Sequence, residues 1–256
     1  MADNAVPVIE TVGLKKYFKT PKGMLHAVDN INLKIMPGET LGVVGESGCG
    51  KSTLGSTIIR LYEPDGGDIL FHGQSTVNLK GRQFKQMRKK MAMIFQDPYS
   101  SLNPRMTVLD QIADPMRVNR TYKSRAERYR RASELMDTVG LASRVAGSYP
   151  HELDGGRRQR IGVARALALN PEFIVCDEPV SALDLSIQAQ ILNLLMDLQD
   201  EMGLSYLFIT HDLSVVRHIS RNIMVAYLGQ CVEFAERKRI FENPCHPYTR
   251  ALLAAI

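Results

Sequence analysis

The segment at residues 45–53, GESGCGKST, combines glycines, a lysine and hydroxyl side chains in the spacing of a phosphate-binding loop. Glycines allow successive backbone N–H groups to turn inward around a phosphate. Lys51 can reach the β- and γ-phosphates of a nucleotide, and the Ser52 hydroxyl can ligate Mg²⁺. An ordinary glycine-rich turn is disfavoured, because an apolar run precedes the loop and a helix-like segment follows it. The predicted nucleotide contacts are Gly45, Ser47, Gly48, Cys49, Gly50, Lys51, Ser52 and Thr53.

A second motif, FIVCDE at residues 173–178, supplies what phosphoryl transfer to water still lacks. Its apolar residues predict a buried strand that carries Asp177 to the Mg²⁺ shell, while Glu178 polarises an attacking water. Adjacent side chains on a strand point to opposite faces, so Glu178 must lie where the chain already turns, as Pro179 indicates. The alternative is a strand that ends in a solvated acid pair.

Two further polar residues each follow an apolar run. His211 comes after residues 206–209, and Gln96 comes after residues 91–95. The carboxyl ends of parallel strands share one edge of a sheet, where ligands bind. His211 is therefore a candidate hydrogen-bond partner of the γ-phosphate, and Gln96 a candidate sensor of Mg²⁺ or water. Taken alone, each is also compatible with a structural role.

The pattern of apolar runs predicts an α/β fold. Short runs separated by helical patterns indicate a buried parallel sheet, with strands at residues 41–44, 91–95, 173–176, 206–209 and 223–227. Residues 8–35 alternate apolar and polar positions, which predicts antiparallel strands at the N-terminus, and residues 68–72 add another. A helical face at residues 187–202 is expected to pack in the core.

No strand pattern occurs between Gln96 and about Arg160, where helix-like stretches at residues 108–118 and 124–139 alternate with turns. We expect one domain over residues 1–256. Its core and β-subdomain comprise residues 1–95 and 161–256, and an inserted helical subdomain comprises about 96–160.

Composition limits the classes of protein further. The chain has 256 residues, 45% of them hydrophobic, a net charge of +5 and four cysteines without metal-ligand spacing, which we expect to be free thiols. Residues 1–10 lack the features of a secretion signal and no apolar stretch spans a membrane, so a cytoplasmic protein is expected. This net charge is too small to indicate that the protein binds nucleic acid. The basic stretches at residues 80–90 and 122–131 favour solvated helix faces, with anionic lipid or an acidic partner as alternatives.

Together these motifs resemble the ATPase subunits of ABC transporters over essentially the whole chain. The order and spacing match for the phosphate loop, Gln96, LDGGRRQR at residues 153–160, the Asp177–Glu178 pair, SALD at residues 181–184, and His211. More narrowly, residues 95–105, 149–152 and 243–250 are similar to the oligopeptide and dipeptide importers, above all to the second of their two ATPases, the DppF/OppF type.

The resemblance implies a P-loop NTPase with a RecA-like parallel-sheet core, an N-terminal antiparallel β-subdomain and an inserted helical subdomain. It implies a head-to-tail dimer in which ATP lies between one phosphate loop and the other subunit's signature motif. Carried over by position, Tyr17 stacks on adenine, with Phe18 as the fallback. Lys51 and Ser52 bind phosphate and Mg²⁺, while Gln96 contacts Mg²⁺ and links to the membrane subunits.

For hydrolysis, the resemblance implies that Asp177 supports Mg²⁺, Glu178 is the general base and His211 orients the γ-phosphate. Asp154, Gly155 and Gly156 belong to the signature that contacts the partner's ATP, and Asp184 belongs to the loop that crosses the dimer interface.

One departure from the family pattern concerns this signature, which usually reads Leu-Ser-Gly-Gly-Gln. Here Asp154 and Arg157 replace the serine and the glutamine. A carboxylate near a γ-phosphate costs ~1–3 kcal/mol unless Arg157 or Arg158 neutralises it. Because the signature serves the partner's nucleotide, we expect a heterodimer with two unequal ATP sites.

The expected function is an ATP-hydrolysing subunit that powers a peptide importer from the cytoplasmic face of the cell membrane. Its expected partners are a second ATPase, two transmembrane permease subunits and, indirectly, an extracellular substrate-binding protein, with no nucleic acid. A nickel or glutathione importer of the same family is an alternative. A non-transport ABC protein that acts on nucleic acid or the ribosome is disfavoured by the single ATPase half, the absence of heptads and the importer-like tail.

Overall fold

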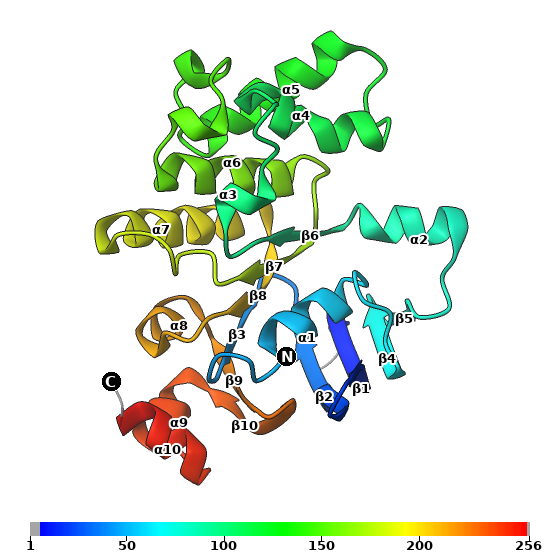
Figure 1. Cartoon of the computed structure of the whole chain (residues 1–256), viewed down its shortest axis with the longest axis vertical. Coiled ribbons are helices and arrows are strands. Elements are labelled where there is room, and N and C mark those ends of the chain that lie inside the picture. The colour runs from blue at the N-terminus through cyan, green and yellow to red at the C-terminus, as the bar shows by residue number, and fades with distance from the viewer. Residues whose placement is uncertain (1–5, 255–256) are drawn as a thin grey trace.

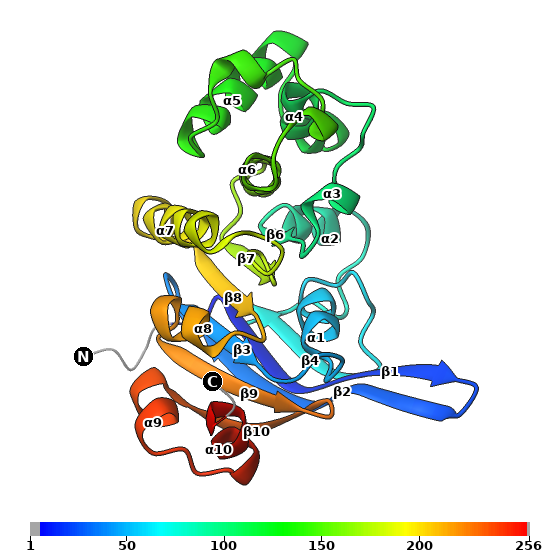
Figure 2. The same cartoon turned by 60° about the vertical axis from the view of Figure 1, so that its left-hand side comes forward.

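Two β-sheets form the frame of the fold in the computed structural model, which describes residues 6–254 (Figure 1). The described residues do not include residues 1–5, which are part of the stretch that was tested for a secretion signal. They also do not include residues 255–256 at the end of the predicted domain. The first sheet is antiparallel with strand order β2-β1-β4-β5. Its strands are β1 (Ile9–Thr20), β2 (Gly23–Ile35), β4 (Gly66–Phe71) and β5 (Gln74–Ser75). The expectation of N-terminal antiparallel strands is confirmed, and β1 and β2 extend beyond the body as an arm (Figure 2).

The second sheet has strand order β10-β9-β3-β8-β7-β6, and all its pairings are parallel except that of β9 with β10. Its strands are β3 (Thr40–Val44), β6 (Met91–Ile94), β7 (Phe173–Asp177), β8 (Ser205–Ile209), β9 (Asn222–Tyr227) and β10 (Gln230–Glu236). The five predicted parallel strands are confirmed. Strand β10 was not predicted, because it is an edge strand of mixed polarity rather than an apolar run.

Both faces of the central strands are buried, which explains their continuous apolar sequences. On β8, Tyr206 and Phe208 face the helical side, whereas Leu207 and Ile209 face the antiparallel sheet. Helix α1 (Lys51–Ile58) packs on this second side through Leu54 and Ile58. Helix α7 (Leu185–Met202) packs on the first side, as its predicted apolar face requires.

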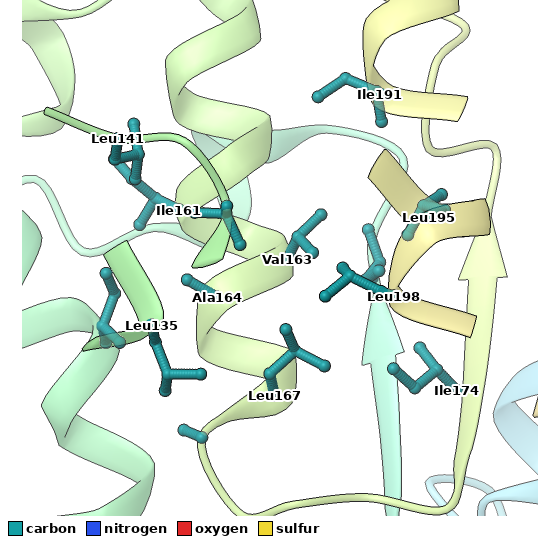
Figure 3. Close-up of a cluster of buried hydrophobic side chains, with 14 of the residues drawn as sticks. Leu135, Leu141, Ile161, Val163, Ala164, Leu167, Ile174, Ile191, Leu195 and Leu198 are labelled. Carbon is teal, nitrogen blue, oxygen red and sulfur yellow. The ribbon is translucent and has the colours of Figure 1, made fainter. Parts of the chain in front are cut away.

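The segment between β6 and β7 is helical, as predicted, and forms a separate layer (Figure 1). It contains α3 (Pro98–Ser101), α4 (Val108–Val118), α5 (Arg125–Thr138), the 3₁₀ turns η1 (Ser143–Val145) and η2 (Pro150–Glu152), and α6 (Gly155–Leu167). Helix α6 continues past residue 160, so the division predicted there falls inside a helix. Figure 3 shows α6 packed on both sides: Ile161 lies beside Leu141 and Ala164 beside Leu135 of the helical layer, while Val163 faces Leu195 and Leu198 of α7.

The basic stretches form helices. The segment at residues 122–131 begins α5, and the segment at residues 80–90 contains α2 (Gly81–Arg88). Arg88 departs from the expected solvated face, since its guanidinium donates to the carbonyl of Ile59 and burial lowers its pKa.

The C-terminal segment closes the other end of the central sheet. Helices α8 (Leu213–Ile219), α9 (Arg237–Glu242) and α10 (Pro247–Ala254) share an apolar cluster with β3 and β9, which includes Val44, Val225 and Ile240. All four cysteines are free thiols, as expected. Within residues 6–254, none of the helices combines the length and the apolar character needed to cross a bilayer.

Candidate functional site

A cavity of about 740 Å³ lies where the phosphate loop, the β1–β2 arm and the ends of the central strands meet. Its lining includes every residue from Ser47 to Thr53 of the predicted loop. Gln96, Glu178 and His211 line it as well. The structure therefore brings together three polar residues that the sequence places up to 115 positions apart.

The phosphate loop connects β3 to α1 and depends on its glycines. Gly45, Gly48 and Gly50 have φ values of 154°, 79° and 104°, which other residues rarely adopt. Space is also limiting, because a Cβ on Gly50 would lie 1.9 Å from the carbonyl oxygen of Ala27. The loop thus adopts the expected turn between a buried strand and a helix N-terminus, the arrangement that favours a bound phosphate.

The ammonium of Lys51 binds the backbone at the start of this loop. Its Nζ donates to the carbonyl oxygens of Gly45, at 2.7 Å, and Glu46, at 2.9 Å, and the residue is only 5% exposed. Because these two hydrogen-bond partners are neutral carbonyl oxygens, the ammonium can also attract an incoming anion. Lys51 is consequently well placed to meet the phosphates of a nucleotide in the cavity.

Ser52 and Asp177 form the oxygen pair predicted for Mg²⁺. The Ser52 hydroxyl donates to Oδ1 of Asp177 over 2.8 Å, and Asp177 is 7% exposed at the end of β7. Burial raises the pKa of the Asp177 carboxyl, and the neighbouring Glu178 raises it further. An adjacent hard cation would relieve this unfavourable buried charge, so the donor chemistry fits Mg²⁺.

Glu178 lies at the turn after β7, as predicted. Its φ is 46°, and its N–H donates to the carbonyl of Ile209 over 2.9 Å. Oε2 of Glu178 accepts a 3.0 Å hydrogen bond from Nε2 of Gln96 and lies 3.1 Å from Nδ1 of His211. Its side chain is only 12% exposed. A carboxylate fixed by two neighbours beside the cavity suits a general base, since it can accept a proton without first reorienting.

The aromatic residue beside the cavity is Phe18 rather than Tyr17. Tyr17 stacks on His26 at a centroid distance of 4.0 Å, and its hydroxyl donates to Oδ1 of Asp29 over 2.6 Å. Phe18, the fallback, belongs to the lining together with His26. The geometry therefore favours Phe18 over Tyr17 for a contact with a base.

The signature residues lie apart from this cavity. Asp154 is the N-cap of α6, where Oδ1 accepts from the backbone N–H of Arg157 over 2.8 Å. Its other carboxylate oxygen lies 3.4 Å from Nε of Arg157. The guanidinium of Arg158 instead lies over the ring of Tyr99, at 5.3 Å. Of the two predicted neutralising residues, Arg157 is the one that pairs with Asp154.

The two signature glycines lie beside the segment that follows Glu178, Gly155 against its loop and Gly156 against the first turn of α7. A Cβ on Gly155 would meet Leu183 at 3.1 Å, and one on Gly156 would meet Ile187 at 2.7 Å. Asp184 lies between these two contact residues as the N-cap of α7. The predicted site residues hence form two groups, one around the cavity and one on a separate surface.

Several residues near the cavity were missed from the sequence. Ala27, Leu228 and Gly229 belong to its lining, and Tyr248 bonds to the phosphate loop. Gly229 has a φ of 80° and follows a run of apolar residues, so a turn there was predictable. Its contact with the distant phosphate loop was not predictable.

Comparison with known proteins shows the family to which the chain belongs. The family model described as "ABC transporter" matches residues 28–181, so the fold and the site define an ABC-type ATPase. A second model, "Oligopeptide/dipeptide transporter, C-terminal region", matches residues 232–256. The chain belongs to the family of oligopeptide and dipeptide transport ATP-binding proteins.

Individual similarities extend over nearly the whole chain. The oligopeptide transport ATP-binding protein OppF of Bacillus subtilis is 55% identical over 250 residues, covering 97% of this chain and 82% of that protein. The dipeptide transport ATP-binding protein DppF of Haemophilus influenzae is 47% identical over 255 residues, covering 97% and 78%. The dimeric cassette MJ0796, bound to ADP and Pi, superposes with a TM-score of 0.80 at 31% identity, covering 90% and 98%. The predicted fold class and family are confirmed.

Proposed function

We propose that this chain binds ATP with Mg²⁺ and hydrolyses it to power the import of oligopeptides or dipeptides. The observation that carries the proposal is the meeting of Gln96, Glu178 and His211 beside the phosphate loop. The match of its C-terminal residues to the oligopeptide/dipeptide transporter region supports the choice of cargo class.

In this proposal the loop N–H groups and Lys51 hold the phosphates. Ser52 and Asp177, with Gln96, hold Mg²⁺, which when bound neutralises charge on the phosphates. Glu178 accepts the proton of the attacking water, and His211 orients the γ-phosphate. Phe18 stacks on the adenine, a role supported by its position in the lining of the cavity.

We further propose that the second half of the ATP site comes from a partner subunit. The surface around Asp154, Gly155 and Gly156 lies apart from this chain's own cavity, which supports its use by a neighbour's nucleotide. A heterodimer with a second, related ATPase is proposed because of Asp154. A carboxylate there weakens the partner's ATP site, although Arg157 offsets part of its charge.

Asp154→Ser tests this asymmetry. Removal of the carboxylate raises the ATP affinity of the partner's site about fivefold, equivalent to about 1 kcal/mol, the lower end of the range because the pair with Arg157 is already formed. ATP titration of the assembled heterodimer measures this change. Asp200→Ser, at an exposed carboxylate of α7, is the control. If partner-site affinity and turnover both stay unchanged, the proposed asymmetry is wrong.

We also propose that the chain works at the cytoplasmic face of the membrane, on two permease subunits that receive cargo from an extracellular binding protein. Affinity purification from detergent-extracted membranes should recover two multi-spanning proteins and a second ATPase, with untagged cells as the control. Recovery of ribosomes or DNA instead would contradict transport. Loss of nickel or glutathione uptake on gene deletion, with peptide uptake intact, would contradict the cargo class.

A further inference from the structure

The C-terminal segment contacts the phosphate loop directly. Tyr248 of α10 accepts a 3.0 Å hydrogen bond at its hydroxyl from the backbone N–H of Glu46. We infer that Tyr248 is a positioning residue for ATP binding, which holds the first turn of the phosphate loop and thereby the ammonium of Lys51. This inference rests on the proposed function, because it assigns the loop to ATP.

The contact acts on a single peptide unit. The carbonyl of Gly45 and the N–H of Glu46 belong to the same planar peptide group. The carbonyl accepts from Nζ of Lys51 over 2.7 Å, and the N–H donates to Tyr248. Because the group is rigid, the orientation that Tyr248 imposes on its N–H also fixes where its carbonyl, and so the Lys51 ammonium, lies.

Tyr248 is itself held in place. The carboxylate of Glu233 on β10 accepts from the N–H groups of Cys245, at 2.8 Å, and His246, at 2.9 Å, just before α10 begins. The ring of Tyr248 also packs on that of Tyr227, with a centroid distance of 4.3 Å. The hydroxyl therefore reaches Glu46 from a support that is anchored at the edge of the central sheet, in the region that has its own family model.

The loop has little other freedom at this point. A Cβ on Gly45 would lie 2.2 Å from the carbonyl oxygen of Ala226, and the N–H of Gly229 donates to the carbonyl of Cys49 over 2.9 Å. The β9–β10 hairpin thus supports one side of the loop, while Tyr248 fixes the peptide at its start. Loss of one hydrogen bond there should loosen the loop without unfolding it.

Tyr248→Phe removes only the hydroxyl, and Tyr227→Phe is the matched control because it removes the neighbouring hydroxyl and leaves the bond to Glu46. In the assembled transporter, we expect Tyr248→Phe to raise the KM for ATP about fivefold, with kcat at saturating ATP within about twofold. Hydrogen exchange at the Glu46 amide should accelerate by at least about fivefold, and the control should change neither quantity.

Glu233→Gln provides a second route to the same effect, since it weakens the support of α10 while leaving Tyr248 intact. It should raise the KM for ATP in the same direction, and its combination with Tyr248→Phe should add less than the sum of the single changes. A KM for Tyr248→Phe equal to that of the wild type, or an equal rise in Tyr227→Phe, would overturn the inference while the proposed function stands. Wild-type protein that binds no ATP would overturn both.

Discussion

Glu178→Gln lowers ATP turnover of the assembled transporter by at least about 100-fold and leaves ATP affinity within about threefold of the wild-type value. Removal of a general base typically costs a factor of 10²–10⁴. The glutamine keeps the size of the side chain and can still pair with Gln96 and His211, but its amide cannot accept a proton from water. The phosphate contacts of the loop do not involve this side chain, so binding persists.

Steady-state hydrolysis and binding of a fluorescent ATP analogue measure these two effects separately. Glu201→Gln, at an exposed carboxylate on α7, is the matched control and should behave like the wild type. Appreciable residual turnover in Glu178→Gln would mean that another group accepts the proton and that the base is misassigned.

Gly50→Ala is expected to have the second large effect, on both ATP binding and folding. Gly50 has a φ of 104°, and the added Cβ would lie 1.9 Å from the backbone oxygen of Ala27. Neither backbone can yield without moving the phosphate loop or the β1–β2 arm. Left-handed strain and overpacking together lower the free energy of unfolding by about 2–5 kcal/mol, and ATP affinity falls by at least about 30-fold.

Gly203→Ala is the control that introduces left-handed backbone strain without a steric clash. Gly203 has a φ of 66° at the end of α7, yet nothing lies within 4 Å of an added Cβ. This control should lose only about 1 kcal/mol of stability and keep full ATP affinity. Urea unfolding and ATP titration measure both variants. If Gly50→Ala were no less stable than Gly203→Ala, the close packing of the loop against Ala27 would not limit its shape.

The sequence alone was sufficient to predict the parts of the fold and the site that lie within short contiguous segments. The phosphate loop, the buried parallel strands and the position of Glu178 at a turn all follow from short motifs, because strand periodicity and Pro179 constrain the local backbone. The ends of neighbouring parallel strands share an edge, which explains why Gln96 and His211 could be assigned to the same place.

Irregular or long-range features could not be predicted in this way. The family resemblance places Tyr17 at the adenine by position alone, and it does not report that the pairing of β1 with β2 changes register between Lys16 and Tyr17. Helical spacing does not choose between Arg157 and Arg158, because residues three and four apart both share a face with Asp154. Arg158 instead lies over the ring of Tyr99, a contact that the sequence does not report. The bond between Glu46 and Tyr248 spans 202 positions, and no local pattern reports it.

The close packing of the signature glycines on Leu183 and Ile187, which follow Glu178 in the chain, has a mechanical consequence. Leu183 and Ile187 occupy the space that a side chain on Gly155 or Gly156 would need, so the two sides pack closely and a shift of one presses on the other. In the proposed dimer, one of these sides serves the partner's ATP and the other continues from the base that acts on this chain's own ATP. Each subunit would thus couple the two nucleotides mechanically, through a packing contact made at two residues that have no side chains.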